Sequence, residues 1–353
     1  MSYSQPSSVL VIGDGLAGTL MGWELARRNI AFEIWSDGRT GASSVAAGMF
    51  NPVSFRRILP QWEAHEQLVT AQDFYEELEA KLGMKLWHEV PIVRVFPDEQ
   101  YAKLWEERSA GGHDVSPFIE CLSPAEIHPS VYAPFGAGLV RKAGWVDVKS
   151  MIEGSRFMWQ RSGQWHQKIW SMDDGCPEGF SHVMDCRGTG AAEDLARFGI
   201  ELRRNHGEVI TVRTEEDWGD RTVNNVTWAL PLGDGSYKIG STYRWDLDRP
   251  DCLEGTSQEL LASVLNARQD SRVDGSNVTE HQAGLRPSCF DRRPVLGRVS
   301  EGLDWYLCCT GFGTRGVVVG PTSVKWTVAS LLAEIHAVPD EVNPRRFRTF
   351  TKN

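Results

Sequence analysis

Three glycines near the start of the chain have the spacing of a turn that holds a pyrophosphate. The run Gly13-Asp14-Gly15-Leu16-Ala17-Gly18 follows an apolar stretch and opens a segment with helical periodicity. In such a turn Gly13 bends the chain, Gly15 lets the backbone approach the phosphates, and Gly18 lets the helix pack closely on the strand. Leu16 and Ala17 begin the helix, whose N-terminus supplies amide donors and a positive dipole end. The sequence therefore predicts a dinucleotide site here.

The acidic residue that usually contacts the ribose of such a cofactor is displaced in this chain. Counting from the glycines places it at Ser36, at the end of the second strand, whereas the acid comes one residue later, at Asp37. A hydroxyl can also hydrogen-bond a ribose. Both Ser36 and Asp37 are therefore candidates for this contact.

A parallel sheet is needed to position these residues, and the pattern predicts one. Residues 9–12 form a continuous apolar run, as a buried parallel strand does, and residues 31–35 read as the second strand, with a helix over 17–28 between them. Residues 84–150 read as short strands and turns, and residues 207–245 as an antiparallel sheet. The other expected elements are helices over 63–82, 99–109, 257–266 and from 316 onward, and strands over 183–185 and 304–309.

Nucleotide-binding segments thus lie at both ends and in the middle of a chain whose 353 residues suit two domains. We predict an α/β plus α+β fold, in which a Rossmann-like cofactor-binding domain is interleaved with an antiparallel-sheet substrate domain. The discontinuous cofactor domain is assigned to 1–55, 140–205 and 285–353, and the substrate domain to 56–139 and 206–284.

The composition excludes several classes of partner. A net charge of −10 makes nucleic acid an unfavourable partner, and no apolar stretch is long enough to span a membrane. The polar start of the chain shows no signal peptide, so we expect a cytoplasmic protein. Seven scattered cysteines fit a reducing compartment, and Cys308 and Cys309 are expected on opposite faces of a strand rather than in a disulfide. The nine histidines show no metal-ligand spacing, so we expect no metal.

Further motifs resemble the D-amino-acid oxidase superfamily, and most closely its glycine oxidase and sarcosine oxidase branches. These motifs are the small-residue run 42–49, the middle segment 185–190, the run Ala283-Gly284-Leu285-Arg286-Pro287 with Pro294 to Gly297 after it, and the run 310–316. The resemblance implies FAD as the cofactor. It assigns FAD contacts, beyond those of the glycine turn, to Ser43, Ser44, Ala47, Gly48, Met49, Gly188, Gly313, Thr314, Arg315 and Gly316.

The same resemblance assigns four residues to the substrate. The carboxylate-binding arginine of the family falls on Arg286, and a second one falls on Arg315; a guanidinium fork matches a carboxylate in bidentate fashion. The alternative for Arg286 is a structural ion pair, for example with Asp291. A tyrosine that faces the substrate in the family falls on Trp228, and a second pocket position falls on Tyr243. The alternative for both aromatic residues is packing within the sheet.

In this family the substrate amine passes hydride to flavin N5, and the protein contributes positioning and electrostatics. The resemblance therefore implies an enzyme that oxidises a small amino acid or secondary amine carrying a carboxylate, with oxygen or another electron acceptor. The turn from Gly313 to Gly316 would place amides near the flavin N1–C2 carbonyl. No cysteine or histidine matches a covalent flavin link, since Cys289 does not align, so FAD is expected to be noncovalent. A homo-oligomer is compatible with the sequence.

Three other functions stay open at this point. The arginines would equally suit a flavin dehydrogenase or oxidase of a hydroxy acid or larger carboxylated metabolite. A related flavin domain occurs in tRNA-modifying oxidoreductases, although the net acidity opposes this function. A non-catalytic flavin-binding protein is the third. In addition, Arg56 or Arg57 is a candidate for a second anion contact, with a solvated loop as the alternative.

Overall fold

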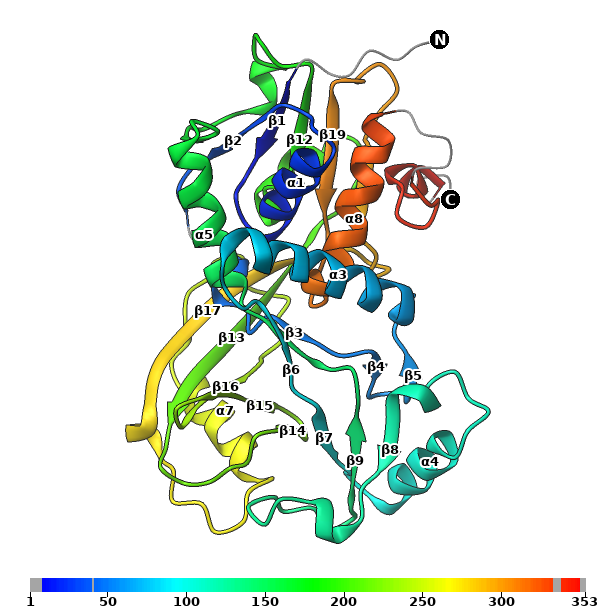
Figure 1. The fold of residues 1–353 in the computed structure, drawn as a ribbon, viewed down its shortest axis with the longest axis vertical. Coiled ribbons are helices and arrows are strands. Elements are labelled where there is room, and N and C mark those ends of the chain that lie inside the picture. Colours follow the sequence, from blue (N-terminus) through cyan, green and yellow to red (C-terminus); the bar gives the residue numbers. More distant parts are fainter. Residues whose placement is uncertain (1–7, 40, 333–337, 350–353) are drawn as a thin grey trace.

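A six-stranded sheet forms the upper part of the molecule in the computed structural model (Figure 1). The structure describes residues 8–39, 41–332 and 338–349, so residues 1–7, on which the expectation of no signal peptide rests, lie outside it. The sheet order is β11-β2-β1-β12-β19-β18, and only the edge pairing of β18 with β19 is antiparallel. Its strands are β1 Val9–Ile12, β2 Phe32–Ser36, β11 Trp165–Gln167, β12 His182–Asp185, β18 Val295–Arg298 and β19 Tyr306–Thr310.

Helices cover one face of this sheet because its strands are apolar on both sides. All four residues of β1 are buried. Helices α1 (Leu16–Arg27) and α8 (Gly316–Leu331) lie side by side on this face, with α5 (Val148–Arg161) beside them and α3 (Ala64–Leu82) crossing below (Figure 1).

Glycines let these helices approach one another. A Cβ built at Gly316 would lie 2.8 Å from Leu16 Cδ2, and one at Gly320 would lie 2.6 Å from Leu20 Cδ1. The third glycine of the N-terminal turn acts in the same way, because a Cβ at Gly18 would lie 1.8 Å from the Gly13 carbonyl oxygen. The close helix–strand packing predicted for Gly18 is therefore confirmed.

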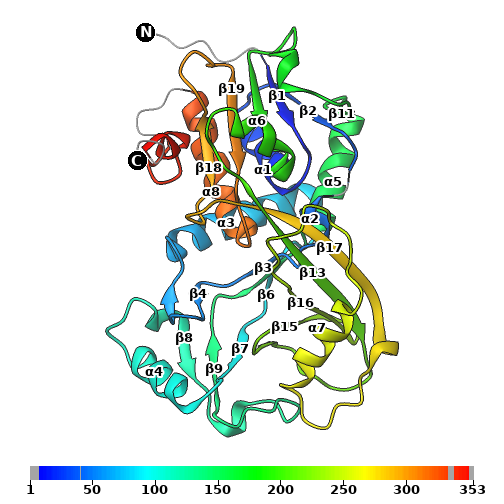
Figure 2. The same ribbon diagram turned by 180° about the vertical axis from the view of Figure 1, so that it is seen from behind.

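The opposite face of the sheet has its own apolar core, seen from behind in Figure 2, where the short helix α6 (Ala192–Ala196) covers it. Cys308 belongs to this core and Cys309 to the core beneath α1 and α8. Both thiols are free and buried. The prediction that these cysteines lie on opposite faces of one strand is confirmed.

An eight-stranded sheet, in the order β17-β13-β16-β15-β14-β7-β9-β8, forms the lower part of the molecule (Figure 1). Its neighbouring strands pair antiparallel except for one pair that matters for the site: β14 pairs with β7 in parallel. Helix α7 (Thr256–Leu265) packs on the sheet through a separate apolar cluster. The strands are β7 Ile92–Val95, β8 Ile119–Cys121, β9 Ala137–Val140, β13 Arg203–Arg213, β14 Thr222–Asn224, β15 Trp228–Gly233, β16 Ser236–Gly240 and β17 Val278–Ser288.

Smaller elements complete the chain. The run expected to be irregular contains a short helix, α2 (Ala42–Val45), and helix α4 spans Glu99–Ser109 as predicted. Strands β3, β10 and β6 form a three-stranded sheet, and β4 and β5 form a two-stranded one. Their bounds are β3 Met49–Phe50, β4 Val53–Ser54, β5 Leu59–Pro60, β6 Trp87–Glu89 and β10 Gly144–Val146.

The predicted fold class is confirmed, and the main sequence-level omission is α5. This helix had clear signals: the Asp147 side chain caps it by accepting from Ser150 N, and Val148, Met151, Ile152 and Trp159 are buried at helical spacing. The domain boundaries stay a prediction. Helix α3 falls in segment 56–139 yet packs against α8 of the cofactor domain. None of the described helices is long and apolar enough to cross a membrane.

The close contact at Gly18 generates a test. In Gly18→Ala the new Cβ would collide with the Gly13 carbonyl, so the variant should be destabilised by about 1–3 kcal/mol even though alanine is the better helix former. We expect a lower midpoint of urea unfolding. Gly275→Ala is the control, because no heavy atom lies within 4 Å of that Cβ position. Equal midpoints for the two variants would contradict the packing argument.

Candidate active site

The predicted cofactor residues gather at one edge of the six-stranded sheet. Strands β1, β2, β12 and β19 are mutually parallel, so their carboxyl ends meet at the same edge, where ligands of open α/β sheets bind. Each strand is followed by a predicted contact segment. These segments are Gly13 to Gly18 after β1, Ser36 and Asp37 at β2, Gly188 after β12, and Gly313 to Gly316 after β19.

The N-terminus of α1 is suited to an anion. It has no side-chain cap and no acidic residue in its first turn, so first-turn amides, which lack intrahelical acceptors, keep their positive character. Gly13 has a φ of 92°, in the left-handed region that favours glycine. The Ser43 hydroxyl accepts from Leu16 N at 3.0 Å and lies 3.2 Å from a Cβ built at Gly15. This contact brings the glycine turn and the 42–49 segment together.

The rest of the 42–49 segment follows directly. Ser44 lies within α2, and Ala47 and Gly48 lead from it to Met49 at the start of β3. Gly48 has a φ of 66°, and a Cβ there would lie 2.0 Å from the Val146 carbonyl oxygen. The small residues of this segment therefore allow close backbone packing.

A carboxylate does lie at the end of β2, but Asp14 supplies it. The buried Ser36 hydroxyl donates to Asp14 Oδ1 at 2.7 Å, while Trp165 Nε1 and an Arg156 guanidinium nitrogen contact Asp14 Oδ2 at 2.9 and 2.7 Å. Asp37 is paired with Arg39 instead, at 2.6 Å. Sequence reasoning missed Asp14, although a charged residue between the first two glycines was visible. The ribose contact stays a prediction.

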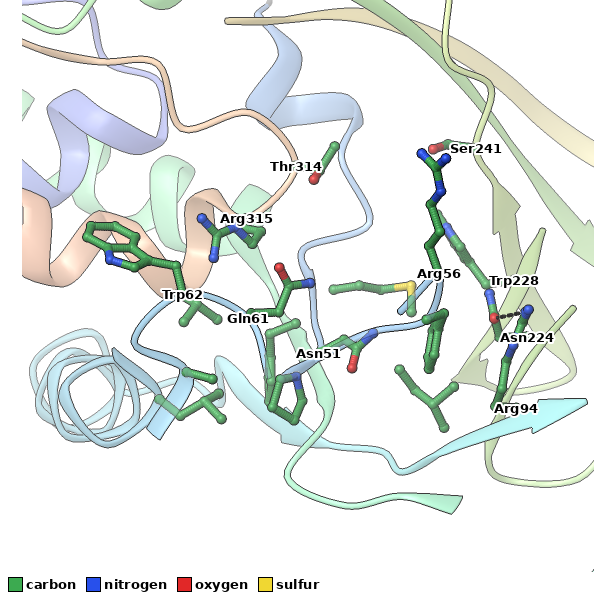
Figure 3. A pocket seen from close by; sticks show the side chains of 18 of the residues that line it. Asn51, Arg56, Gln61, Trp62, Arg94, Asn224, Trp228, Ser241, Thr314 and Arg315 are labelled. Atoms are coloured by element: carbon green, nitrogen blue, oxygen red, sulfur yellow. Dashed lines mark hydrogen bonds between the residues drawn. The ribbon is translucent and has the colours of Figure 1, made fainter. Parts of the chain in front are cut away.

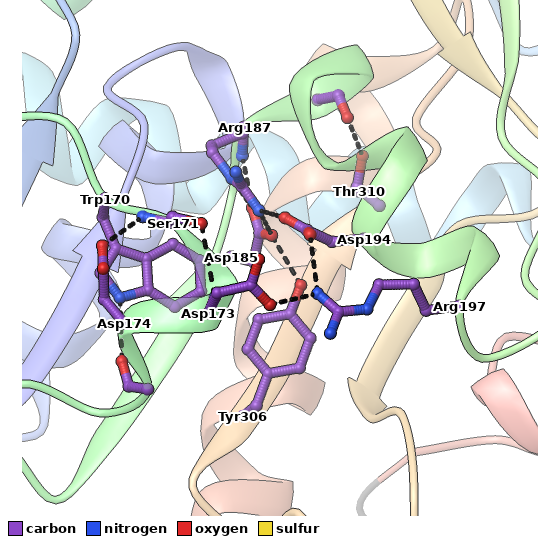
Figure 4. A network of polar contacts seen from close by, with 12 residues as sticks. Trp170, Ser171, Asp173, Asp174, Asp185, Arg187, Asp194, Arg197, Tyr306 and Thr310 are labelled. Atoms are coloured by element: carbon purple, nitrogen blue, oxygen red, sulfur yellow. Dashed lines mark hydrogen bonds and ion pairs between the residues drawn. The ribbon is translucent and has the colours of Figure 1, made fainter.

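A buried polar network fixes the loop that carries Gly188 (Figure 4). The Tyr306 hydroxyl donates to Asp185 Oδ2 at 2.6 Å, and Arg187 binds both Asp185 and Asp194 at 2.6 Å. Burial, together with the charge of Asp185, raises the pKa of Tyr306. The fully buried Asp185 is thus satisfied from two sides, which stabilises the turn after β12.

The N-terminus of α8 resembles that of α1. It has neither a side-chain cap nor an acidic residue in its first turn. Gly313, with a φ of 57°, donates its N–H to the Pro287 carbonyl at 2.8 Å and so joins this turn to the end of β17. Two uncapped, acid-free helix ends at one sheet edge, lined by glycines, fit an extended anionic dinucleotide cofactor.

A cavity of about 460 Å³ lies beside the α8 N-terminus (Figure 3). It brings together residues from both ends and the middle of the chain. Five residues predicted to belong to the site line it, namely Met49, Trp228, Tyr243, Thr314 and Arg315.

Arg286 lies behind this cavity wall rather than among its lining residues. Its guanidinium donates to Asn205 Oδ1 and Ser241 Oγ, both at 2.9 Å, and lies 4.9 Å from the centre of the Tyr243 ring. A Cβ at Gly207 would lie 2.1 Å from both terminal nitrogens, so the guanidinium rests on the bare backbone of Gly207.

The suggested ion pair between Arg286 and Asp291 is wrong, because Asp291 pairs with Arg346 at 2.8 Å. Within the described residues Arg286 has no carboxylate partner, and burial lowers its pKa below the ordinary value. Ser241 and Tyr243, which line the cavity, are its immediate neighbours.

Arg315 is also a cation without a counter-ion. Burial, followed by repulsion from Arg293 and Arg292, lowers its pKa to about 10, so it stays charged at neutral pH. Its side chain makes no hydrogen bond or ion pair with any described residue. Its nearest aromatic neighbour is Trp62, whose ring centre lies 6.0 Å from the guanidinium carbon.

The two predicted aromatic residues reach the cavity in different ways. Trp228 lies opposite Gly240 in the β15–β16 pairing, and a Cβ at Gly240 would lie 2.9 Å from its ring. Trp228 therefore both packs on the sheet and faces the cavity. Tyr243 is 57% exposed, so packing within the sheet does not account for it.

Sequence reasoning missed several lining residues. The most notable is Arg94, a charge within the otherwise apolar strand β7; the others include Asn51, Gln61, Trp62 and Asn224. Of the pair Arg56 and Arg57, only Arg56 lines the cavity.

One group of described side chains, Glu208, Cys252 and His281, has ligand atoms within 4.8 Å of one another. The His281–Glu208 hydrogen bond of 2.8 Å accounts for part of that proximity, and the absence of a metal stays a prediction.

Comparisons with known proteins agree with this architecture. A bifunctional protein of tRNA 5-methylaminomethyl-2-thiouridine biosynthesis from Legionella pneumophila (strain Lens) is 20% identical over 96% of this chain, but the chain spans only 57% of that relative. Glycine oxidase from Pseudomonas putida (strain KT2440) is 26% identical, over 90% of this chain and 92% of its own length. The crystal structure of glycine oxidase from Geobacillus kaustophilus matches with a TM-score of 0.75 and 21% identity, over 92% of this chain and 94% of the other.

The family model for FAD dependent oxidoreductases (DAO) matches residues 8–330, which is most of the chain. The cofactor predicted from the two loops and the closing motifs is thereby confirmed as FAD, and the predicted superfamily is confirmed with it. The protein belongs to the FAD dependent oxidoreductase family.

Proposed function

We propose that the protein oxidises a small amino acid or secondary amine that carries a carboxylate. The observation that carries this proposal is a cavity beside the α8 N-terminus, with the uncompensated Arg315 in its wall and Arg286 directly behind Ser241 and Tyr243. Two guanidinium groups without carboxylate partners in the described structure favour an anionic ligand. The glycine oxidase relative supports an amine as the reacting group.

Each residue then has a defined task. The turns of α1 and α8, with the 42–49 segment and Gly188, would hold FAD, which when bound supplies the hydride acceptor. Arg315 would orient the substrate carboxylate, and Arg286 would add positive charge from behind Ser241 and Tyr243. Compared with the tyrosine of the family, Trp228 would add bulk and remove a hydroxyl near the substrate, so we expect the preferred amine to differ from glycine. No protein base is required by this assignment.

Anaerobic mixing of the holoenzyme with D-, L- and N-methyl amino acids tests the proposal. At least one amine should bleach the flavin absorbance, because hydride transfer does not require oxygen. If no member of the panel reduces the flavin, amine oxidation is excluded. Repeating the experiment in air, with oxygen consumption as the measurement, distinguishes an oxidase from a dehydrogenase.

Rival functions have their own tests. Flavin reduction by hydroxy acids but not by amines would favour the hydroxy-acid alternative. The Legionella relative favours, as a second candidate, oxidation of an amine on modified tRNA. Salt-dependent retention of tRNA by the protein would support it, against the net charge of −10. Any ligand-dependent reduction of the flavin would exclude a non-catalytic role. We also propose a cytoplasmic location and leave the oligomeric state to solution measurement.

FAD is predicted to be noncovalent, since no cysteine or histidine lines the cavity within the described residues. Cys289 is buried and burial raises the pKa of its thiol to about 12, so it is a poor nucleophile at neutral pH. Acid precipitation should release all FAD into the supernatant. Yellow colour that stays with the denatured pellet would contradict this expectation.

Gly207 tests the position of Arg286 without removing the arginine. In Gly207→Ala the new Cβ would displace the guanidinium, and we expect about 10- to 100-fold weaker binding of a substrate carboxylate, measured as Kd from flavin absorbance. The double variant Gly207→Ala with Arg286→Ala should bind no more weakly than Arg286→Ala alone, because both changes act on one contact. Additive losses would show that Gly207 acts by another route.

A further inference from the structure

The cavity contains more positive charge than one carboxylate requires. Three arginines line it, namely Arg56, Arg94 and Arg315, and no aspartate or glutamate does so within the described residues. The nearby acid Glu63 is not among the lining residues, and its carboxylate accepts a hydrogen bond from Gln67 at 3.4 Å. Positive charges that are partly buried, as those of Arg94 and Arg315 are, are unfavourable unless an anion compensates them.

The arginines occupy separate parts of the cavity. In Figure 3 Arg315 lies beside Trp62, whereas Arg56 and Arg94 lie on the other side, with the Arg56 guanidinium near Ser241 and the Arg94 guanidinium near Asn224. One carboxylate at Arg315 would leave the other two cations without a partner.

Arg94 is held in place by neutral groups only. One terminal nitrogen donates to Asn224 Oδ1 at 2.7 Å and to the Asn225 carbonyl, and the guanidinium lies 5.1 Å from the Phe55 ring. Its buried Nε–H has no hydrogen-bond partner among the described residues. These contacts fix the fork of Arg94 while its charge stays uncompensated.

Arg56 complements this arrangement. It is exposed, lines the cavity and makes no ion pair with a described residue, and in Figure 3 its guanidinium extends toward Ser241. An exposed arginine can change rotamer at little cost, so it can close over an anion that Arg94 already holds.

We infer that Arg94 and Arg56 form a second anion site, and that the substrate is an amino acid with a second anionic group. This inference rests on the proposed function, in which Arg315 takes the first carboxylate. The second group is a carboxylate or a phosphonate at the end of the substrate remote from the reacting carbon. Neutral amide analogues of the same shape should bind poorly, because they leave the two arginines uncompensated.

Binding of unreactive ligands tests the second site independently of turnover. The holoenzyme is titrated with succinate and with its monoamide succinamate, and Kd is read from the perturbation of the flavin spectrum. We expect succinate to bind about 10- to 100-fold more tightly, as one charge-assisted hydrogen-bonding site predicts. Equal affinities would overturn the inference even if amines reduce the flavin.

Variants assign the preference to residues. Arg94→Met and Arg56→Met should each reduce the succinate preference, while Arg57→Met, an exposed neighbour outside the cavity, should leave it unchanged. If Arg94→Met does not fold, Arg56→Met alone decides, since Arg56 supports no described contact. Loss of affinity for both ligands alike, or an equal effect of Arg57→Met, would overturn the assignment.

Turnover then identifies the anion and separates the two proposals. Anaerobic flavin reduction is compared within three pairs, each in both enantiomers. The pairs are aspartate against asparagine, glutamate against glutamine, and 2-amino-3-phosphonopropionate against 2-aminobutyrate. A preference for the dianion in the carboxylate or the phosphonate series supports the second site. The series that shows the preference identifies the anionic group that the site binds. Reduction by amines without such a preference contradicts the second site and leaves amine oxidation standing. Succinate selectivity without any amine turnover would support the second anion site but contradict amine oxidation, and with it an amino acid as the substrate.

Discussion

The approach of α1 to the carbonyl of Gly13 is the contact on which the rest of the structure depends. It exists only because residue 18 has no side chain. It places the helix end over the sheet edge, and α8 then packs on α1 through two further glycines. Helix α3 packs on α8 and supplies Ala64, Gln67 and Leu68 to the cavity wall. The glycine turn and the cavity beside the α8 N-terminus are thus connected by one series of helix contacts.

The sequence was informative where chemistry and position are local. The glycine turn lies between its own strand and helix, so six consecutive residues predicted it. The start of helix α8 at Gly316 and the opposite faces of Cys308 and Cys309 were predicted in the same way, from short-range periodicity. The family resemblance then supplied Trp228, Tyr243 and Arg315, which the fold brings to one cavity although they come from distant parts of the chain.

The residues that were missed depend on long-range pairing. Arg94 meets Asn224 only because β7 pairs in parallel with β14, and the two residues are 130 positions apart. Asp14 reaches the end of β2 only because β1 and β2 are adjacent in the sheet. Local patterns contain no information on such pairings, so the role of Asp14 was missed although it lies within the glycine turn, and Arg94 lies outside every motif that the resemblance covers.

Charge is distributed unevenly between the surface and the cavity. The chain as a whole carries a net charge of −10, while the cavity lining carries three arginines and no acid within the described residues. An acidic exterior keeps anionic macromolecules away, and a positive cavity attracts small anions that can enter it. The overall charge of the chain is therefore a poor guide to the charge of its ligand.

The guanidinium of Arg286 resting on Gly207 has a consequence for how relatives are compared. The arginine can lie where it does only because residue 207 has no side chain, so the two positions are expected to coevolve. A homologue with a larger residue at 207 would need a shorter or absent side chain at 286. The residue at 207 would therefore indicate whether a relative can keep an arginine behind Ser241 and Tyr243.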